Sequence, residues 1–380
     1  MITTYIQELF MHIFIFFIMS SLLLLGCQKP IPHQNEDELT SQQAAKKITS
    51  QEECQKIDQI MQKIDHHSAI EALNQINVQL KQCIATVENA QQLKWLESST
   101  EMYQRFLEGH QQTKEYYTRY YPHFEKYTIS LLDNENVWEQ LDRNEPVQGD
   151  ITLFRELAPR DQYLFNHQQQ AYIHLQALSE GVFEFHRKPQ YVIDIFASTL
   201  PKDQQDFIQR MAKDNRDPTF GDASLTISWQ ELVERALFWE RYVQKYPKGY
   251  FTPDAKKLFE DYSNFIFFGL DNTPVSENYT TDSWIDEDAL QQIKFLAKNH
   301  NTQLNKKAQK FLSFIKTPTE QRQEKFKLQP IELFDEYGHK KHPQQIAHEQ
   351  LRLALNIKPR DWNTSRDCYT DAICFRHKWN

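Results

Sequence analysis

Residues 228–268 read SWQELVERALFWERYVQKYPKGYFTPDAKKLFEDYSNFIFF and predict two helices joined by a short turn. Ser228 stands three residues before Glu231, which is the spacing of a capping box at the start of a helix. Apolar residues then recur at helical spacing, at Leu232, Ala236, Trp239 and Val243. Thr252-Pro253 begins the second helix, because proline fits the first helical position.

The same signals occur outside this stretch and predict an all-α body. Further capping boxes begin at Ser50, Ser68 and Thr317. The expected helices span residues 50–65, 68–87, 89–119, 123–132, 151–157, 160–180, 189–198, 201–213, 229–246, 253–268, 285–299, 303–315, 318–326 and 343–356. The alternation typical of strands is nearly absent, and its best candidate is the short stretch 182–186.

The composition excludes several classes of protein. The chain has 380 residues, of which 40% are hydrophobic and 25% charged, as expected of a folded protein. It contains only 8 glycines, and none lies closer than twenty residues to the next. Phosphate-binding loops need clustered glycines, and β-sandwiches need many tight turns. We therefore expect an irregular helical bundle or an array of helical hairpins with long loops.

Residues 13–27 read IFIFFIMSSLLLLGC and indicate export. The apolar run 13–25 is too short to span a bilayer, which takes about 20 residues, and its length is typical of a signal-peptide core. The ending LLGC, at residues 24–27, resembles the lipobox of bacterial lipoproteins. The resemblance implies that residues 1–26 are removed as a signal peptide and that the thiol of Cys27 carries a diacylglyceryl group.

The resemblance also implies a destination. Gln28 follows Cys27, and the absence of Asp at that position implies the outer membrane, with the body facing the periplasm or the cell surface. Residues 1–26 contain no Lys or Arg, whereas signal peptides begin with a basic segment. A start at Met11 removes the acidic residue of this segment without adding a positive charge. A plain secretory signal and an uncleaved anchor helix stay open as alternatives.

The rest of the chain divides by composition. Residues 27–49 are polar, contain two prolines and show no apolar period, so we expect a flexible tether after the lipidated cysteine. We expect an N-terminal helical hairpin or bundle at 50–132 and a main helical domain at 151–356. Residues 357–380 are expected to form a C-terminal tail closed by a local disulfide.

The cysteine count favours disulfides. Without Cys27, four cysteines remain, and an exported protein meets an oxidising compartment. Pairing of neighbours along the chain joins Cys54 to Cys83 and Cys368 to Cys374, although three connectivities are possible. Zinc is the alternative, but neither pair has the Cys-x-x-Cys spacing of a structural zinc site.

Long loops carry aromatic residues that are candidates for contact with a partner. The irregular stretches 133–150, 214–227 and 270–284 each begin with or near an Asp-Asn pair, which we expect to end a helix in the left-handed conformation. The aromatic residues in question are Trp138, Phe220, Tyr279 and Trp284. Binding residues are common on loops, but aromatic side chains also fold back onto helices, and both interpretations stay open.

A second resemblance concerns architecture alone. Residues 239–258, WERYVQKYPKGYFTPDAKKL, place a Tyr-Pro turn between two helices. This turn resembles the one in tetratricopeptide-type repeats of envelope lipoproteins. The resemblance covers about twenty residues, and no repeat of about 34 residues runs along the chain. It implies a helical hairpin and no functional residue.

The motifs of catalysis and metal binding are absent from the sequence. Asp65-His66-His67 is the densest group of metal ligands, but adjacent histidines on a helix point about 100° apart. His167 and His174 lack a third ligand, and Glu97 lacks the glycine-rich segment of lytic transglycosylases. We therefore expect no cofactor and no metal.

The charge and the missing motifs together suggest a function class. Without Glu8, 43 basic residues face 51 acidic ones, so the mature charge of −8 argues against nucleic acid as a partner. We expect a non-catalytic lipoprotein that is held to the membrane by its lipid and contacts envelope proteins or a cell-wall polymer. The alternative is an envelope hydrolase without a recognisable motif.

Overall fold

The computed structural model describes residues 52–376, with the exception of 144, 180, 282, 299–301, 336 and 361–365. Cys27, the expected signal peptide and the tether lie outside the described residues. Residues 51–380 form one compact unit, and the finer boundaries within it remain predictions. None of the described helices is long and apolar enough to cross a membrane.

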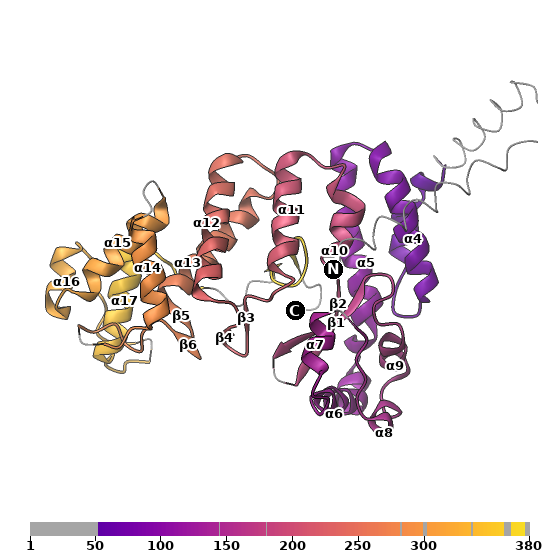
Figure 1. The fold of residues 1–380 in the computed structure, drawn as a ribbon, viewed down its shortest axis with the longest axis horizontal. Helices are drawn as coiled ribbons and strands as arrows, with labels where there is room; N and C mark the ends of the chain where they lie inside the picture. Colours follow the sequence, from indigo (N-terminus) through magenta and orange to yellow (C-terminus); the bar gives the residue numbers. More distant parts are fainter. Residues whose placement is uncertain are drawn as a thin grey trace, which may run out of the picture. The chain divides into compact units, whose positions relative to one another are not determined.

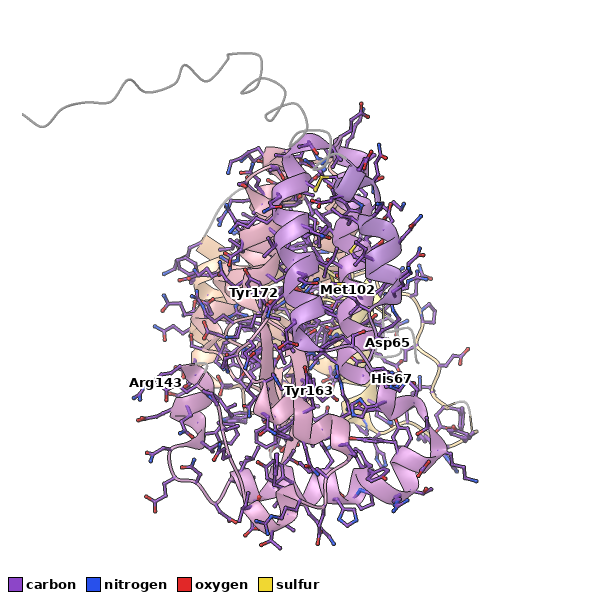
Figure 2. All side chains as sticks on the ribbon, turned by 90° about the vertical axis from the view of Figure 1, so that its right-hand side faces the viewer. Asp65, His67, Met102, Arg143, Tyr163 and Tyr172 are labelled. Atoms are coloured by element: carbon purple, nitrogen blue, oxygen red, sulfur yellow. A yellow bond between two sulfur atoms is a disulfide. The ribbon has the colours of Figure 1, made fainter. Side chains whose placement is uncertain are left out.

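The body is mostly α-helical, which confirms the predicted fold class. Its first part contains α3 (Ile57–Lys63), α4 (Ile70–Cys83), α5 (Asn89–Glu108), α6 (Tyr121–Leu131), α7 (Val137–Asp142), α8 (Ile151–Phe154), α9 (Pro159–Asn166) and α10 (Gln190–Val192). Short 3-10 turns η1 (Ile84–Thr86) and η2 (Gly109–Gln112) and π turns η3 (Tyr116–Tyr120) and η4 (Ile193–Ala197) interrupt them. Figure 2 shows Met102 of α5 among packed side chains, where it is fully buried.

The second part continues with α11 (Lys202–Asp214), α12 (Trp229–Lys245), α13 (Thr252–Phe268), α14 (Glu287–Lys298), α15 (Gln303–Ile315), α16 (Thr319–Lys325) and α17 (Pro343–Leu355). The predicted helical hairpin is confirmed, because α12 and α13 pack against each other. The Ser228 hydroxyl accepts a hydrogen bond from the backbone N–H of Glu231 at 3.1 Å, as the capping box predicts. Between the helices, Phe251 stacks on Phe207 of α11 with ring centroids 4.4 Å apart.

The helix predicted over 160–180 is wrong in its second half. Helix α9 ends at Asn166, and β1 (Ile173–Ser179) pairs antiparallel with β2 (Val182–Arg187). Three residues between α9 and β1 have positive φ, which stops a helix: Gln169, Ala171 and Tyr172. Alternate side chains of the hairpin enter the core, so burial across the strand pair outweighs the helical preference of the local sequence.

The long helix predicted over 89–119 is also interrupted. Helix α5 ends at Glu108, and Gly109 begins a 3-10 turn. A Cβ atom at Gly109 would lie 2.6 Å from Nδ1 of His66, so a larger residue at this position would require the His66 side chain to move. The chain turns there and resumes as a π turn before α6.

The long loops contain hairpins that the sequence pattern does not indicate. Strands β3 (Phe220–Gly221) and β4 (Ser224–Leu225) form one hairpin, and β5 (Gly269–Leu270) and β6 (Thr273–Pro274) form another. Figure 1 places both below the helices α11 to α14 in that view. The prediction that Asp-Asn pairs adopt the left-handed conformation is wrong, because none of the residues 133, 134, 214, 215, 271 and 272 has a positive φ.

Both predicted cysteine pairs lie at disulfide distance. The Cα atoms of Cys54 and Cys83 are 5.6 Å apart, and this bond ties the segment before α3 to the end of α4. The Cα atoms of Cys368 and Cys374 are 4.2 Å apart, and this bond closes a short loop between β7 (Arg366–Asp367) and β8 (Phe375–Arg376).

The disulfide loop, residues 366–376, packs against the helices of the body. Both of its cysteines are buried in the hydrophobic core. Arg366 forms an ion pair with Asp254 of α13 at 2.6 Å, and the carbonyl of Arg376 accepts a hydrogen bond from Gln104 of α5. The loop therefore joins helices from the two parts of the body.

Candidate functional site

A cavity of about 470 Å³ lies where three hairpins meet the disulfide loop. We call it the hairpin groove. Its lining residues are Gln176, Ala177 and Leu178 of β1, residues 218–223 at the β3–β4 hairpin, Leu270 and Asp271 at the β5–β6 hairpin, and Tyr369 and Thr370 of the disulfide loop. Figure 1 shows the β1–β2 and β3–β4 hairpins on either side of the region below α11.

The turn between β3 and β4 brings main chain close to the β1–β2 hairpin. Asp222 and Ala223, the two central residues of the turn, have φ values of 46° and 55°. Positive φ at both central positions is typical of the type I′ turns that close tight hairpins. A Cβ atom at Gly221 would lie 3.1 Å from the carbonyl oxygen of Leu178, so glycine lets these two hairpins approach each other.

The β5–β6 hairpin is fastened to the β3–β4 hairpin by hydrogen bonds. Asn272 donates its backbone N–H to the carbonyl of Ala223 at 3.0 Å and its side-chain amide to the carbonyl of Asp222 at 2.7 Å. The hydroxyl of Thr273 accepts from the backbone N–H of Leu225 at 2.9 Å. These bonds place Asp222 and Asp271 on neighbouring turns at the same wall of the groove.

The segment that leads into β3 is positioned by a buried arginine. Arg235 of α12 is 1% exposed, and its guanidinium donates to the carbonyls of Asp214 and Asp217 at 2.8 and 3.0 Å. It also forms an ion pair with Asp214, which in turn pairs with Arg210 at 2.9 Å. Because one rigid guanidinium donates to both carbonyls, it holds the segment that leads into β3, and with it this wall of the groove, to helix α12.

The base of the groove is built by the disulfide loop. The ring of Tyr369 packs edge-on against Phe220 with centroids 4.9 Å apart, and its hydroxyl donates to Asp261 at 2.8 Å. Burial and the neighbouring carboxylate of Asp261 raise the pKa of Tyr369 well above its ordinary value, so it stays a neutral hydrogen-bond donor. Both aromatic residues are thus engaged within the protein.

A buried ion pair holds the disulfide loop in place. Arg187 of β2 contacts the carboxylate of Asp371 at 2.5 and 3.1 Å, and it also donates to the hydroxyls of Ser99 and Thr100. The side-chain amide of Asn215 donates to the carbonyls of Cys368 and Asp371. Burial raises the pKa of Asp371, while Arg187 opposes this rise.

The edge of β1 contributes main-chain groups. The backbone N–H of Lys188 donates to the carbonyl of Tyr172, so these two residues are a hydrogen-bonded pair. Hydrogen-bonded and non-hydrogen-bonded pairs alternate along an antiparallel ladder. Ala177 and Phe183, five pairs further along, are therefore a non-hydrogen-bonded pair. The N–H and C=O of Ala177 consequently point away from β2. The neighbouring side-chain oxygen of Gln176 is buried and accepts no hydrogen bond from any described residue.

The charge of the lining is uniformly negative. Asp222 and Asp271 are its charged residues, and Lys, Arg and His do not occur among the lining residues. Both carboxylates are exposed, and neither has an ion pair or a side-chain hydrogen bond within the part of the chain that the structure describes. The groove therefore combines apolar walls with two solvated acidic groups.

The predicted contact aromatics do not gather at one place. Phe220 lines the groove, whereas Tyr279 is only 2% exposed and donates its hydroxyl to the carbonyl of Phe267 at 3.0 Å. Trp138 and Trp284 are 50% and 54% exposed, and neither lines the groove. Tyr279 thus contributes to packing.

The histidines form a separate cluster near the start of the body. His110 contacts the fully buried Asp161 at 2.6 Å, and the hydroxyl of Tyr116 donates to the same carboxylate at 3.1 Å. The rings of His66 and His67 are 3.9 Å apart, and Figure 2 shows His67 at the margin of the ribbon. Within the described residues, no group of three potential ligands is arranged to hold a metal ion.

Glu97 accepts a hydrogen bond from Tyr250 at 2.6 Å on the surface. Apart from Phe220, the residues of the groove were not predicted, and neither was the His110–Asp161 pair. Gly221-Asp222 is a hairpin-turn signal that could have been recognised, because Gly and Asp are common at such turns.

No family model, no curated protein and no solved structure matches this chain.

Proposed function

We propose that the protein is a non-catalytic outer-membrane lipoprotein, anchored through acylated Cys27, whose helical body binds an envelope partner in the hairpin groove. Two or more acyl chains make such an anchor stable, because each buried methylene contributes about 0.8 kcal/mol. The polar stretch 28–49 gives the body reach from the membrane as a tether.

The observation that supports binding rather than catalysis is the lining of the groove. A hydrolase of the cell wall needs a carboxylic acid kept neutral in an apolar, buried position beside a second functional group. The carboxylates of the groove, Asp222 and Asp271, are instead exposed on hairpin turns. The groove offers apolar walls, hydrogen-bonding groups and negative charge, which serve recognition.

Anchoring is tested by cell fractionation. Cys27→Ala should move the protein from the membrane pellet to the soluble fraction, because the acylated thiol is the attachment. A variant that still sediments with membranes after a salt wash contradicts the lipid anchor. Ser41→Ala provides the control, since it changes the stretch after Cys27 without touching the lipobox or the Cys54–Cys83 pair.

Partner contact is tested with a photocrosslinking residue placed in the groove. Position 271 is exposed and has an ordinary φ, so the bulky probe is tolerated there. In cells, the probe at 271 should give a discrete adduct, while the same probe at exposed position 288 on α14 should not. Equal labelling from both positions would contradict a specific role of the groove.

An envelope hydrolase is the second candidate, and the buried His110–Asp161 pair is the observation that favours it. The imidazole and the carboxylate are 2.6 Å apart, and Nδ1 of His110 has no partner among the described residues. Such a pair is able to move a proton. Release of soluble fragments from purified cell wall, abolished by His110→Ala, would support this candidate; no release from the wild type would exclude it.

A further inference from the structure

We propose that the occupant of the hairpin groove is an extended peptide segment of a protein partner, with a basic side chain flanked by apolar ones. This inference rests on the proposed binding function and names the partner's chemistry. The groove supplies three features that such a segment matches: a strand edge, apolar walls and paired acidic turns.

The strand edge recognises the main chain of the peptide. The N–H and C=O of Ala177 point away from β2, and no other described group pairs with them. A β1–β2 sheet of two strands gains a third strand when an extended segment pairs with this edge. The buried, unpartnered oxygen of Gln176 adds an acceptor for one further N–H of the segment.

The walls accept side chains on alternate positions of the strand. Leu178, Phe220 and Leu270 line the cavity, whose volume of about 470 Å³ lies within the ordinary range of ligand pockets. In an extended segment, successive side chains point to opposite faces. Apolar side chains on one face can therefore enter the groove while those between them face its rim.

The negative charge of the groove favours a basic residue in the bound segment. Asp222 and Asp271 lie on adjacent turns that Asn272 ties together, and the lining contains no basic residue to neutralise them. A Lys or Arg of the segment would be attracted to both carboxylates. The mature formal charge of −8 also favours the approach of a basic partner and disfavours nucleic acid.

A peptide fits better than a saccharide. Sugars are held by flat aromatic faces, but the aromatic rings of this lining, Phe220 and Tyr369, pack against each other. The guanidinium of Arg360 also lies over both rings, at 5.0 and 4.9 Å from their centroids. The main-chain groups of β1, by contrast, suit another polypeptide.

The test is fluorescence polarisation with the full-length chain in a non-ionic detergent. The probe is a short capped peptide that alternates Lys and Val. We expect the double variant Asp222→Asn/Asp271→Asn to weaken binding about five- to tenfold at low salt, because it removes two carboxylates and keeps the turns. Asn tolerates the positive φ at position 222, so the variant should fold.

Three controls test separately whether binding depends on the carboxylates of the groove, on main-chain hydrogen bonds and on basic side chains of the peptide. Glu324→Gln/Glu332→Gln removes two exposed carboxylates outside the groove and should leave binding unchanged. A probe methylated at every backbone nitrogen should bind about tenfold more weakly, because it has no N–H left to donate to the edge of β1. A Glu-Val peptide should not compete.

Three outcomes would overturn the proposal: equal binding of the Glu-Val peptide, equal binding of the methylated probe, or specific binding of chitotetraose that displaces the Lys-Val probe. Peptide binding in detergent does not depend on Cys27 or on sedimentation with membranes. Failure of the peptide test therefore leaves the lipid anchor and the crosslinking result unaffected, whereas failure of those two tests leaves the peptide chemistry of the groove intact.

Discussion

Removal of Asp371 should destabilise the body more than the loss of any surface charge. Arg187 and Asp371 are 184 positions apart in sequence, and their side chains are only 3% and 6% exposed. The substitution Asp371→Ala leaves the guanidinium buried without its counter-charge. Removing one partner of a buried ion pair costs about 3–5 kcal/mol of unfolding free energy.

Other contacts of Arg187 set the lower end of this range. Its remaining donors still reach the hydroxyls of Ser99 and Thr100, and its guanidinium lies 4.4 Å from the ring centroid of Tyr191. The two hydroxyls satisfy hydrogen bonds only, and the ring of Tyr191 offsets only part of the charge. We therefore expect a loss of about 3 kcal/mol for Asp371→Ala.

Urea unfolding of the full-length chain, followed by circular dichroism without reductant, measures the loss. Asp58→Ala is the control, since it breaks an ion pair of 3.0 Å with Lys94 at the surface and should cost about 1 kcal/mol or less. The double variant Arg187→Met/Asp371→Ala should cost less than the sum of its single changes, because no charge stays buried alone. A loss for Asp371→Ala as small as that for Asp58→Ala, or strict additivity in the double variant, would refute the reasoning.

Three further predictions concern acid sensitivity, a turn and a disulfide. Burial lowers the pKa of His174 to about 3 from the ordinary 6.5, so the unfolded chain takes up the proton first as the pH falls. Stability should decrease by about 1–3 kcal/mol between pH 6.5 and 4.5, and His174→Gln should flatten this slope in urea midpoints; parallel slopes would contradict it. Gly269→Ala should lower the melting temperature more than Gly338→Ala, because both residues have positive φ but only the Cβ at Gly269 would clash with main chain. Cys54→Ser/Cys83→Ser should cost about 3–4 kcal/mol in unfolding free energy, and free thiols at both positions in a non-reducing peptide map of the wild type would remove the basis of this prediction.

Local signals in the sequence predict most of the helices. Ser228 caps α12 as expected, and α15 and α17 lie within a residue of their predicted bounds. The capping box predicted at Ser68 does not form, because its hydroxyl has another partner. Its hydroxyl bonds to Asp65, and Ala69 takes the N-cap position of α4.

The strands and the groove depend on contacts between distant segments. Residues 173–179 have helical neighbours in sequence, and they become β1 because pairing with β2 buries alternate side chains. The groove takes Ala177, Asp222, Asp271 and Tyr369 from segments that no local pattern connects. The Asp-Asn pairs mark loops correctly, but their role lies in hydrogen bonds of the Asn side chains and in the ion pairs of Asp214.

The buried ion pair also has a consequence for biosynthesis. A ribosome adds about 5–20 residues per second, so the 184 residues between Arg187 and Asp371 take about 10–40 seconds to appear. During that interval the first part of the body lacks the counter-charge that its interior requires. For the exported lipoprotein proposed above, this delay disfavours premature folding in the cytoplasm and keeps the nascent chain suitable for threading across the inner membrane.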